Sequence, residues 1–170
     1  MKTEHQVVAV WNLNYLCNLE CPYCFFALEK RKNPDNNRFG DTDKVIDFFN
    51  KTGRKFLIRL CGGEPFLYPD FIGLCRALTE KNQISVSSNL TGNLLYDFSE
   101  RINPESVEMI DCSLHIVERE RLNLKDDFCE KVNHLKQKKF HLRVTQVMYP
   151  PAIKEFDRTF DYFNKRGITI

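Results

Sequence analysis

The feature that most constrains the fold of this chain is a regular alternation between short β-branched runs and amphipathic helical segments. Runs of this length with a period of two predict strands. The expected strands are residues 7–13, 56–60, 84–88, 107–114 and 140–147, and residues 167–170 resemble a sixth strand that has just begun. Because single helices separate these runs, they should form parallel βαβ units with right-handed crossovers. The chain is therefore predicted to be an α/β protein with a parallel sheet.

Capping residues and apolar spacing predict the helices between these strands. Asp41-Thr42-Asp43 can cap a helix that Gly53 ends, and Pro69 can begin the next one. Further helices are expected within residues 94–98, 118–136 and 153–163, the last of them after the break at Pro150-Pro151. The basic and polar residues 29–39 are expected to form a solvated surface segment.

The composition is that of one globular domain, residues 1–170, which is long enough to bury a substantial core. Apolar residues make up 42% of the chain, and the net charge is only +2, from 25 basic and 23 acidic side chains. This even balance gives no reason to expect nucleic acid or an anionic membrane as a partner. The sequence shows no signal-peptide pattern and no apolar run long enough to span a bilayer. We therefore expect a cytoplasmic protein.

Three of the seven cysteines, Cys17, Cys21 and Cys24, fall within eight residues as Cys-x3-Cys-x2-Cys. An odd number of cysteines without a signal peptide favours metal ligands and free thiols over disulfides. The spacing supplies three ligands, whereas a closed zinc site or an electron-carrying iron–sulfur cluster normally takes four. One coordination position would stay open for a substrate or cosubstrate. The alternatives are a zinc knuckle and a packing group of cysteines.

The other cysteines are expected to have simpler roles. Cys75, Cys112 and Cys129 lie on apolar faces of predicted helices and strands and should be small buried hydrophobes. Cys61 directly precedes a Gly-Gly turn on the inward side of its strand, and its role is left open between a site residue and a spacer.

Two motifs together resemble the radical S-adenosylmethionine enzyme superfamily. The first is the cysteine motif with Tyr23 at its aromatic position, and the second is Gly62-Gly63-Glu64-Pro65. The resemblance implies a [4Fe–4S] cluster on Cys17, Cys21 and Cys24, with the fourth iron chelated by S-adenosylmethionine. An electron from a donor such as flavodoxin or ferredoxin would cleave the sulfonium to a 5′-deoxyadenosyl radical, which abstracts hydrogen from an unidentified substrate, peptide or small molecule.

The resemblance also implies a fold, a partial (β/α)6 barrel of the TIM-like kind. The sheet is expected to be cut short at the start of strand six, so that the C-terminal part of the core would lie beyond residue 170. In β/α barrels the chemistry gathers at the carboxyl ends of the strands. The two motifs follow the first two predicted strands, and Asn89, Ser113 and His115 follow the third and fourth. A substrate-binding region would then lie partly outside these residues.

The family resemblance assigns roles in binding S-adenosylmethionine. The backbone at Tyr23 would approach the adenine, and Ser113 would touch the ribose. Gly62 and Gly63 have no side chain, so a ligand can come close to the backbone, as the family's use of this turn for the methionine amino group requires. Glu64 would accept a hydrogen bond near that amino group, although an ordinary surface glutamate after a Gly-Gly turn would look the same.

Strand parity places Arg143 inside the barrel, where a buried cation needs an anion. The resemblance matches Arg143 to a basic residue that meets the methionine carboxylate, and the alternative is a salt bridge to Asp111. The stretch that ends in Ser88 and Asn89 resembles the family's Thr-Asn-Gly, but Leu90 replaces the glycine, so the turn could differ.

His115 could position substrate or move a proton, or it could be an interior histidine satisfied by a neighbour. The predicted function is that of a radical S-adenosylmethionine enzyme. The alternative is an iron–sulfur binding or electron-transfer module without radical catalysis. Glu64, Ser113 and Arg143 favour the enzyme, because an electron carrier needs no methionine pocket.

Overall fold

The computed structural model describes residues 7–37 and 40–170, and it contains a five-stranded sheet whose order follows the sequence. Every pair of neighbours is parallel. The strands are β1 (Val7–Asn12), β2 (Phe56–Cys61), β3 (Gln83–Ser88), β4 (Val107–Ser113) and β5 (Leu142–Thr145). Sequential parallel order requires a crossover of the same hand after each strand, which is the arrangement of a barrel opened along one side. The predicted α/β class and TIM-like architecture are confirmed.

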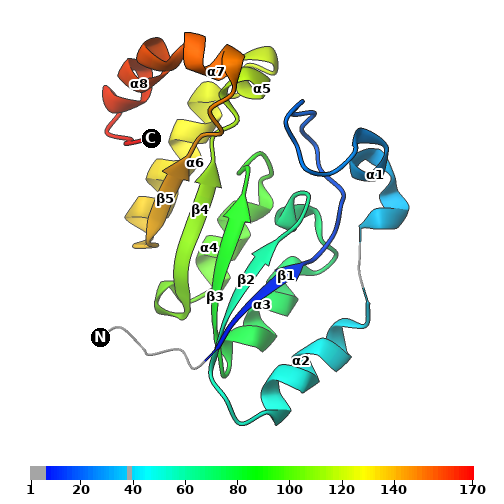
Figure 1. Ribbon diagram of the computed structural model, residues 1–170. Coiled ribbons are helices and arrows are strands. Elements are labelled where there is room, and N and C mark those ends of the chain that lie inside the picture. Colours follow the sequence, from blue (N-terminus) through cyan, green and yellow to red (C-terminus); the bar gives the residue numbers. More distant parts are fainter. Residues whose placement is uncertain (1–6, 38–39) are drawn as a thin grey trace.

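Helices cover one face of this sheet, as Figure 1 shows for α3, α4 and α6. The helices are α1 (Leu28–Lys32), α2 (Thr42–Lys51), α3 (Phe71–Thr79), α4 (Leu94–Arg101), α5 (Ile116–Arg121), α6 (Lys125–Gln137), α7 (Pro150–Lys154) and α8 (Phe156–Asn164). The predicted cap of α2 is present, because the Asp41 side chain accepts a hydrogen bond from the Lys44 amide. No helix in residues 7–37 and 40–170 is both long and apolar enough to cross a membrane.

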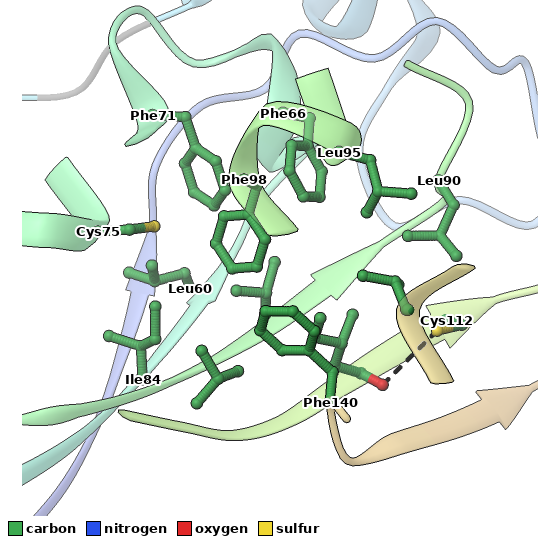
Figure 2. Close-up of a cluster of buried hydrophobic side chains, with 14 of the residues drawn as sticks. Leu60, Phe66, Phe71, Cys75, Ile84, Leu90, Leu95, Phe98, Cys112 and Phe140 are labelled. Carbon is green, nitrogen blue, oxygen red and sulfur yellow. Dashed lines mark hydrogen bonds between the residues drawn. The ribbon is translucent and has the colours of Figure 1, made fainter. Parts of the chain in front are cut away.

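The hydrophobic core lies between the sheet and these helices (Figure 2). Leu60, Ile84 and Cys112 point from the strands toward Phe71 and Phe98, and all five are fully buried. The opposite face of the sheet is open, since Val8 and Val10 on β1 are 52% and 67% exposed. The predicted inward and outward parity of β4 and β5 follows the same division between the two faces. Burial of the helix-facing apolar side chains is the main stabilising contribution to this fold.

Several predicted boundaries are wrong. The segment expected over residues 118–136 is two helices, because Asn123 adopts a left-handed conformation between α5 and α6. The last helical segment is likewise divided at Glu155 into α7 and α8. The expected solvated segment contains helix α1 with a buried Arg31, while its residues 38–39 lie outside the described part of the chain.

The expected start of a sixth strand is also wrong, because residues 167–170 add no strand to the sheet. Gly167 adopts a positive φ of 71°, which turns the chain back so that the Ile168 amide bonds to the Phe163 carbonyl at 3.0 Å. Ile168 is 1% exposed and packs into the core. The apolar character that suggested a strand therefore reflects burial beside α8.

Candidate functional site

A cavity of about 270 Å³ lies at the carboxyl ends of β2 to β4, beneath the loop that follows β1. Every predicted site residue except Glu64 and Arg143 lines it, namely Cys17, Cys21, Tyr23, Cys24, Gly62, Gly63, Ser88, Asn89, Ser113 and His115. Residues from four separate segments thus meet where parallel strands end, which is where ligands bind in β/α folds.

Cys17, Cys21 and Cys24 lie on one short loop that is held by a turn of its own and by α1. The Cys24 amide bonds to the Cys21 carbonyl at 3.2 Å, and the Cys17 amide bonds to the Arg31 carbonyl at 2.9 Å. Burial raises the pKa of the Cys17 thiol to about 11 and also raises the pKa of Cys21. Both thiols are therefore protonated at neutral pH when nothing is bound, and a metal would have to displace these protons.

The thiols are not grouped as the ligands of a single ion would be. Within the part of the chain that the structure describes, no three His, Cys, Asp or Glu side chains are arranged to hold one metal ion. A lone zinc binds sulfur at about 2.3 Å, so its ligands must crowd together. A group of several metal and sulfide atoms bridges thiolates that lie further apart. The three thiols line one cavity from a single loop.

The glycines of the second motif allow the turn after β2 to pack closely against the backbone of residues 14–16. A Cβ at Gly62 would meet the Asn14 carbonyl oxygen at 2.6 Å, and Gly62 has a φ of 145° that favours glycine. A Cβ at Gly63 would overlap the carbonyl groups of Tyr15 and Leu16. The Gly63 and Glu64 amides bond to the Asn14 and Leu16 carbonyls at 2.9 and 2.8 Å. The motif thus docks against the segment that leads into the cysteine loop, while the glycines also line the cavity.

Glu64 is buried beneath the site, with 1% of its surface exposed, so it is not an ordinary surface glutamate. Its carboxylate accepts hydrogen bonds from the Ser88 hydroxyl (2.7 Å), the Asn89 amide (2.7 Å) and the Phe66 amide (3.1 Å). Burial raises its pKa, against the opposing effect of these donors. In this arrangement Glu64 ties the end of β2 to the end of β3, and it does not line the cavity.

The turn after β3 keeps a glycine-like conformation at Leu90, the position where the family motif has glycine. Leu90 is 1% exposed and has a φ of 56°, the left-handed region that ordinary residues seldom adopt. The turn orients Asn89, whose side-chain amide donates to the Asn18 oxygen at 2.9 Å and to the Cys17 sulfur at 3.7 Å. Leu90 therefore preserves the turn and also packs its side chain into the core.

His115 has a neighbour that satisfies it. Its Nδ1 lies 2.7 Å from the Tyr23 hydroxyl, and the two rings stack at 6.0 Å. Burial, with Arg119 nearby, lowers the pKa of His115 to about 4, so the imidazole is neutral at pH 7. Burial also raises the pKa of Tyr23. Both side chains line the cavity, so a structural pair and a substrate-facing role coexist here.

Arg143 lies away from the cavity, on the open face of the sheet. Its guanidinium pairs with the Asp111 carboxylate at 2.6 Å, and its side chain is 56% exposed. The alternative weighed from the sequence, a salt bridge to Asp111, is thus the arrangement observed. Contact of Arg143 with the methionine carboxylate stays a prediction that this arrangement does not support.

Two buried arginines escaped the sequence reasoning. Arg119 is fully buried and donates to the carbonyls of Asn89 and Ser113, and its spacing from the buried Ile116 could have indicated an inward face. Arg31 is 5% exposed and lines the cavity. Charged neighbours surround it in the sequence, so no pattern marked it.

The comparison with protein families agrees with the two motifs. A family model described as the radical SAM superfamily matches residues 11–169. Among curated proteins, a probable GTP 3′,8-cyclase of Saccharolobus solfataricus is 32% identical over 111 residues, covering 64% of this chain and 34% of that protein. A probable GTP 3′,8-cyclase of Methanocella arvoryzae is 30% identical over 112 residues, with 65% and 34% coverage. The chain thus spans about a third of the length of these relatives.

Solved structures share the fold at low sequence identity. The structure of anSMEcpe with bound AdoMet has a TM-score of 0.71 and 15% identity, and the match covers 95% of this chain and 48% of that one. The structure of Streptococcus suis SuiB bound to the precursor peptide SuiA has a TM-score of 0.65 and 16% identity, with 95% and 37% coverage. At these identities the likeness concerns the fold alone.

Proposed function

Because this chain belongs to the radical SAM superfamily, its chemistry is that of a radical SAM enzyme, and we propose that its cavity holds a [4Fe–4S] cluster beside S-adenosylmethionine. Cys17, Cys21 and Cys24 would be the ligands. One observation carries the proposal: three thiols with open-site spacing share a single cavity with the Gly62-Gly63 turn and the ends of β3 and β4.

The donor set fits this cofactor. Iron–sulfur clusters bind cysteine thiolates and usually take four of them, so three leave one iron free for another ligand. The fourth cysteine of the cavity, Cys61, is engaged elsewhere, because its thiol donates to the Asn12 side-chain oxygen at 3.0 Å. When bound and reduced, the cluster would supply the electron that cleaves S-adenosylmethionine and starts hydrogen abstraction from the substrate.

The other lining residues would bind and orient S-adenosylmethionine. We assign the turn at Gly62 and Gly63 to its methionine end and Ser113 to its ribose, with Tyr23, Ser88 and Asn89 completing the pocket. Glu64 would act from beneath, by holding Ser88 and Asn89 in place rather than by touching the ligand. In this assignment the second motif shapes the pocket by docking two loops together.

The substrate would be a nucleotide or another small molecule, or a peptide. The relatives named as probable GTP 3′,8-cyclases make GTP the first compound to test, and the SuiB complex makes a precursor peptide the second. Reduced flavodoxin or ferredoxin would supply the electron.

The ligand assignment is tested by anaerobic reconstitution followed by iron and sulfide analysis. We expect one [4Fe–4S] cluster per chain in the wild type and in Cys61→Ser, and essentially none when Cys17, Cys21 and Cys24 are all changed to alanine. Cys129→Ala is the matched control, since Cys129 is a free, buried thiol on α6. Full cluster content in the triple variant would refute the ligand assignment.

The cosubstrate assignment separates an enzyme from an electron-transfer module. Addition of S-adenosylmethionine should change the electron paramagnetic resonance spectrum of the reduced cluster, and dithionite should then yield 5′-deoxyadenosine. A module without radical catalysis would keep its cluster but show neither change. An unaltered spectrum in a sample where binding is demonstrated independently would place the cosubstrate away from the cluster.

A further inference from the structure

Arg31 is a buried cation at the wall of the cavity. It lies on α1, is 5% exposed, and lines the same space as the three thiols. Its Nη1 donates to the Leu19 carbonyl at 3.1 Å and its Nη2 to the Cys21 carbonyl at 3.3 Å. Its Nε is buried and has no hydrogen-bond partner within the described residues. The guanidinium therefore reaches into the cysteine loop without being fully satisfied there.

This cation also lacks a counter-charge. Among residues 7–37 and 40–170, no Asp or Glu carboxylate lies within 4.0 Å of Arg31. The charges beside it on the loop and helix, Glu20 and Lys32, pair with each other at 3.2 Å. Burying an unpaired ion costs several kcal/mol, so buried charges are normally compensated. No side chain among the described residues therefore forms an ion pair with Arg31.

Arg119, the other buried arginine at this end of the sheet, makes similar contacts but does not line the cavity. Arg119 is fully buried, donates only to backbone carbonyls, and has an Nη1 without a hydrogen-bond partner among the described residues. Burial lowers its pKa to about 10 against the opposing charges of Asp127 and Glu64, and its guanidinium stacks 4.1 Å from the Phe128 ring. Arg31 has carbonyl acceptors only, and both belong to the loop that carries the thiols. The backbone of Arg31 also holds this loop, since its carbonyl accepts from the Cys17 amide.

We propose that the counter-charge of Arg31 is the thiolate-bound iron–sulfur cluster, and that Arg31 is a positioning residue that favours cluster reduction and holds the cysteine loop around it. This inference rests on the proposed function. Reduction adds negative charge to a cluster that thiolates already make anionic, and a fixed cation at low dielectric stabilises the more negative state. Net charge and hydrogen bonding around a cluster set its potential. Loss of Arg31 should therefore make reduction harder.

The test is a redox titration of the reconstituted full chain, followed by electron paramagnetic resonance in the absence of S-adenosylmethionine. Arg31→Gln removes the charge, Arg31→Lys keeps it, and Arg143→Gln removes an exposed charge outside the cavity. We expect Arg31→Gln to disfavour reduction about tenfold, equivalent to about 59 mV for a one-electron couple. Arg31→Lys should lie closer to the wild type, and Arg143→Gln should match it.

The outcomes of these measurements distinguish a role in cluster reduction from other roles of Arg31. A potential unchanged in Arg31→Gln, with affinity for S-adenosylmethionine lowered instead, would assign Arg31 to the methionine carboxylate and overturn the proposal. If Arg31→Gln holds too little cluster for a redox titration, the iron content of Arg31→Gln and Arg31→Lys is measured instead. Retention in Arg31→Lys then supports the charge argument, and equal loss in both variants overturns it. A wild type without any cluster would refute the proposed function itself, which is a separate result.

Discussion

Glu64 offers the sharpest test of how the site is built, because its carboxylate is the acceptor for three donors from two segments. The perturbation is Glu64→Ala, which removes the partner of the Phe66 amide, the Asn89 amide and the Ser88 hydroxyl. Glu64 and Ser88 are each no more than 2% exposed, so water does not readily replace the lost acceptor. The variant should therefore lose stability through unpaired donors.

The magnitude follows from counting those donors. A buried donor left without a partner costs about 1–3 kcal/mol, and the two amides cannot rotate toward another acceptor, whereas the serine hydroxyl can. Glu64→Ala should then reduce the free energy of unfolding by about 2–6 kcal/mol. A domain of this kind has about 5–15 kcal/mol in total, so the loss would be large. Glu64→Gln keeps one acceptor oxygen and should lose about half as much.

The assay is urea unfolding of the metal-free protein under anaerobic reducing conditions, monitored by circular dichroism. Glu80→Ala is the control, because Glu80 is an exposed carboxylate just after α3. Hydrogen exchange gives a second, local measurement: the Asn89 and Phe66 amides should lose protection in the Glu64 variants and keep it in the control. A Glu64→Ala protein whose free energy of unfolding is within about 1 kcal/mol of the wild-type value, with both amides still protected, would contradict this structural role and favour direct contact between Glu64 and the ligand.

His115 has a folded pKa of about 4, below the unfolded value of about 6.5, so its stabilising contribution is complete above pH 6.5 and is lost as pH falls toward 4. Wild type should therefore lose up to about 3 kcal/mol relative to His115→Asn over this range in denaturation measured at each pH, and parallel curves would contradict this. Gly63→Ala should unfold at a lower urea concentration and lose its cluster, because a Cβ at Gly63 would overlap backbone atoms. Gly92→Ala is the control and should be unaffected, because a Cβ there meets open space. Equal stability and cluster content in the two variants would contradict the docking of the two loops. Arg143→Met should leave affinity for S-adenosylmethionine unchanged in binding titrations because Arg143 pairs with Asp111, and a tenfold loss would restore its predicted contact with the carboxylate.

Local patterns in the sequence were enough to predict the sheet and the place of the site. Short β-branched or alternating runs identified all five strands, and strand parity also predicted that Cys112 faces the helices while Arg143 faces the other side. These predictions succeed because alternation and spacing are properties of the backbone over a few residues. The cysteine spacing is local in the same sense, since three thiols within eight residues cannot be far apart whatever the remaining chain does.

Breaks within the helical segments were harder to predict from the sequence. The division between α5 and α6 depends on the left-handed conformation of Asn123, which asparagine tolerates but does not require. The burial of Ile168 beside α8 replaced an expected strand in the same way. An apolar residue next to a turn predicts burial, but the sequence does not say whether a sheet or a helix will bury it.

The kind of chemistry can therefore be predicted from cysteines and glycines, because their spacing is visible along the chain. The pairing of charges that are remote in sequence could not be predicted, because it depends on the folded arrangement. Glu64 turned inward to Ser88 and Asn89, Arg143 outward to Asp111, and Arg31 toward the cysteine loop without a carboxylate of its own. The physical reason is that a buried charge is stabilised by whatever group lies within a few ångströms, and those neighbours come from segments far apart in sequence that only folding brings together.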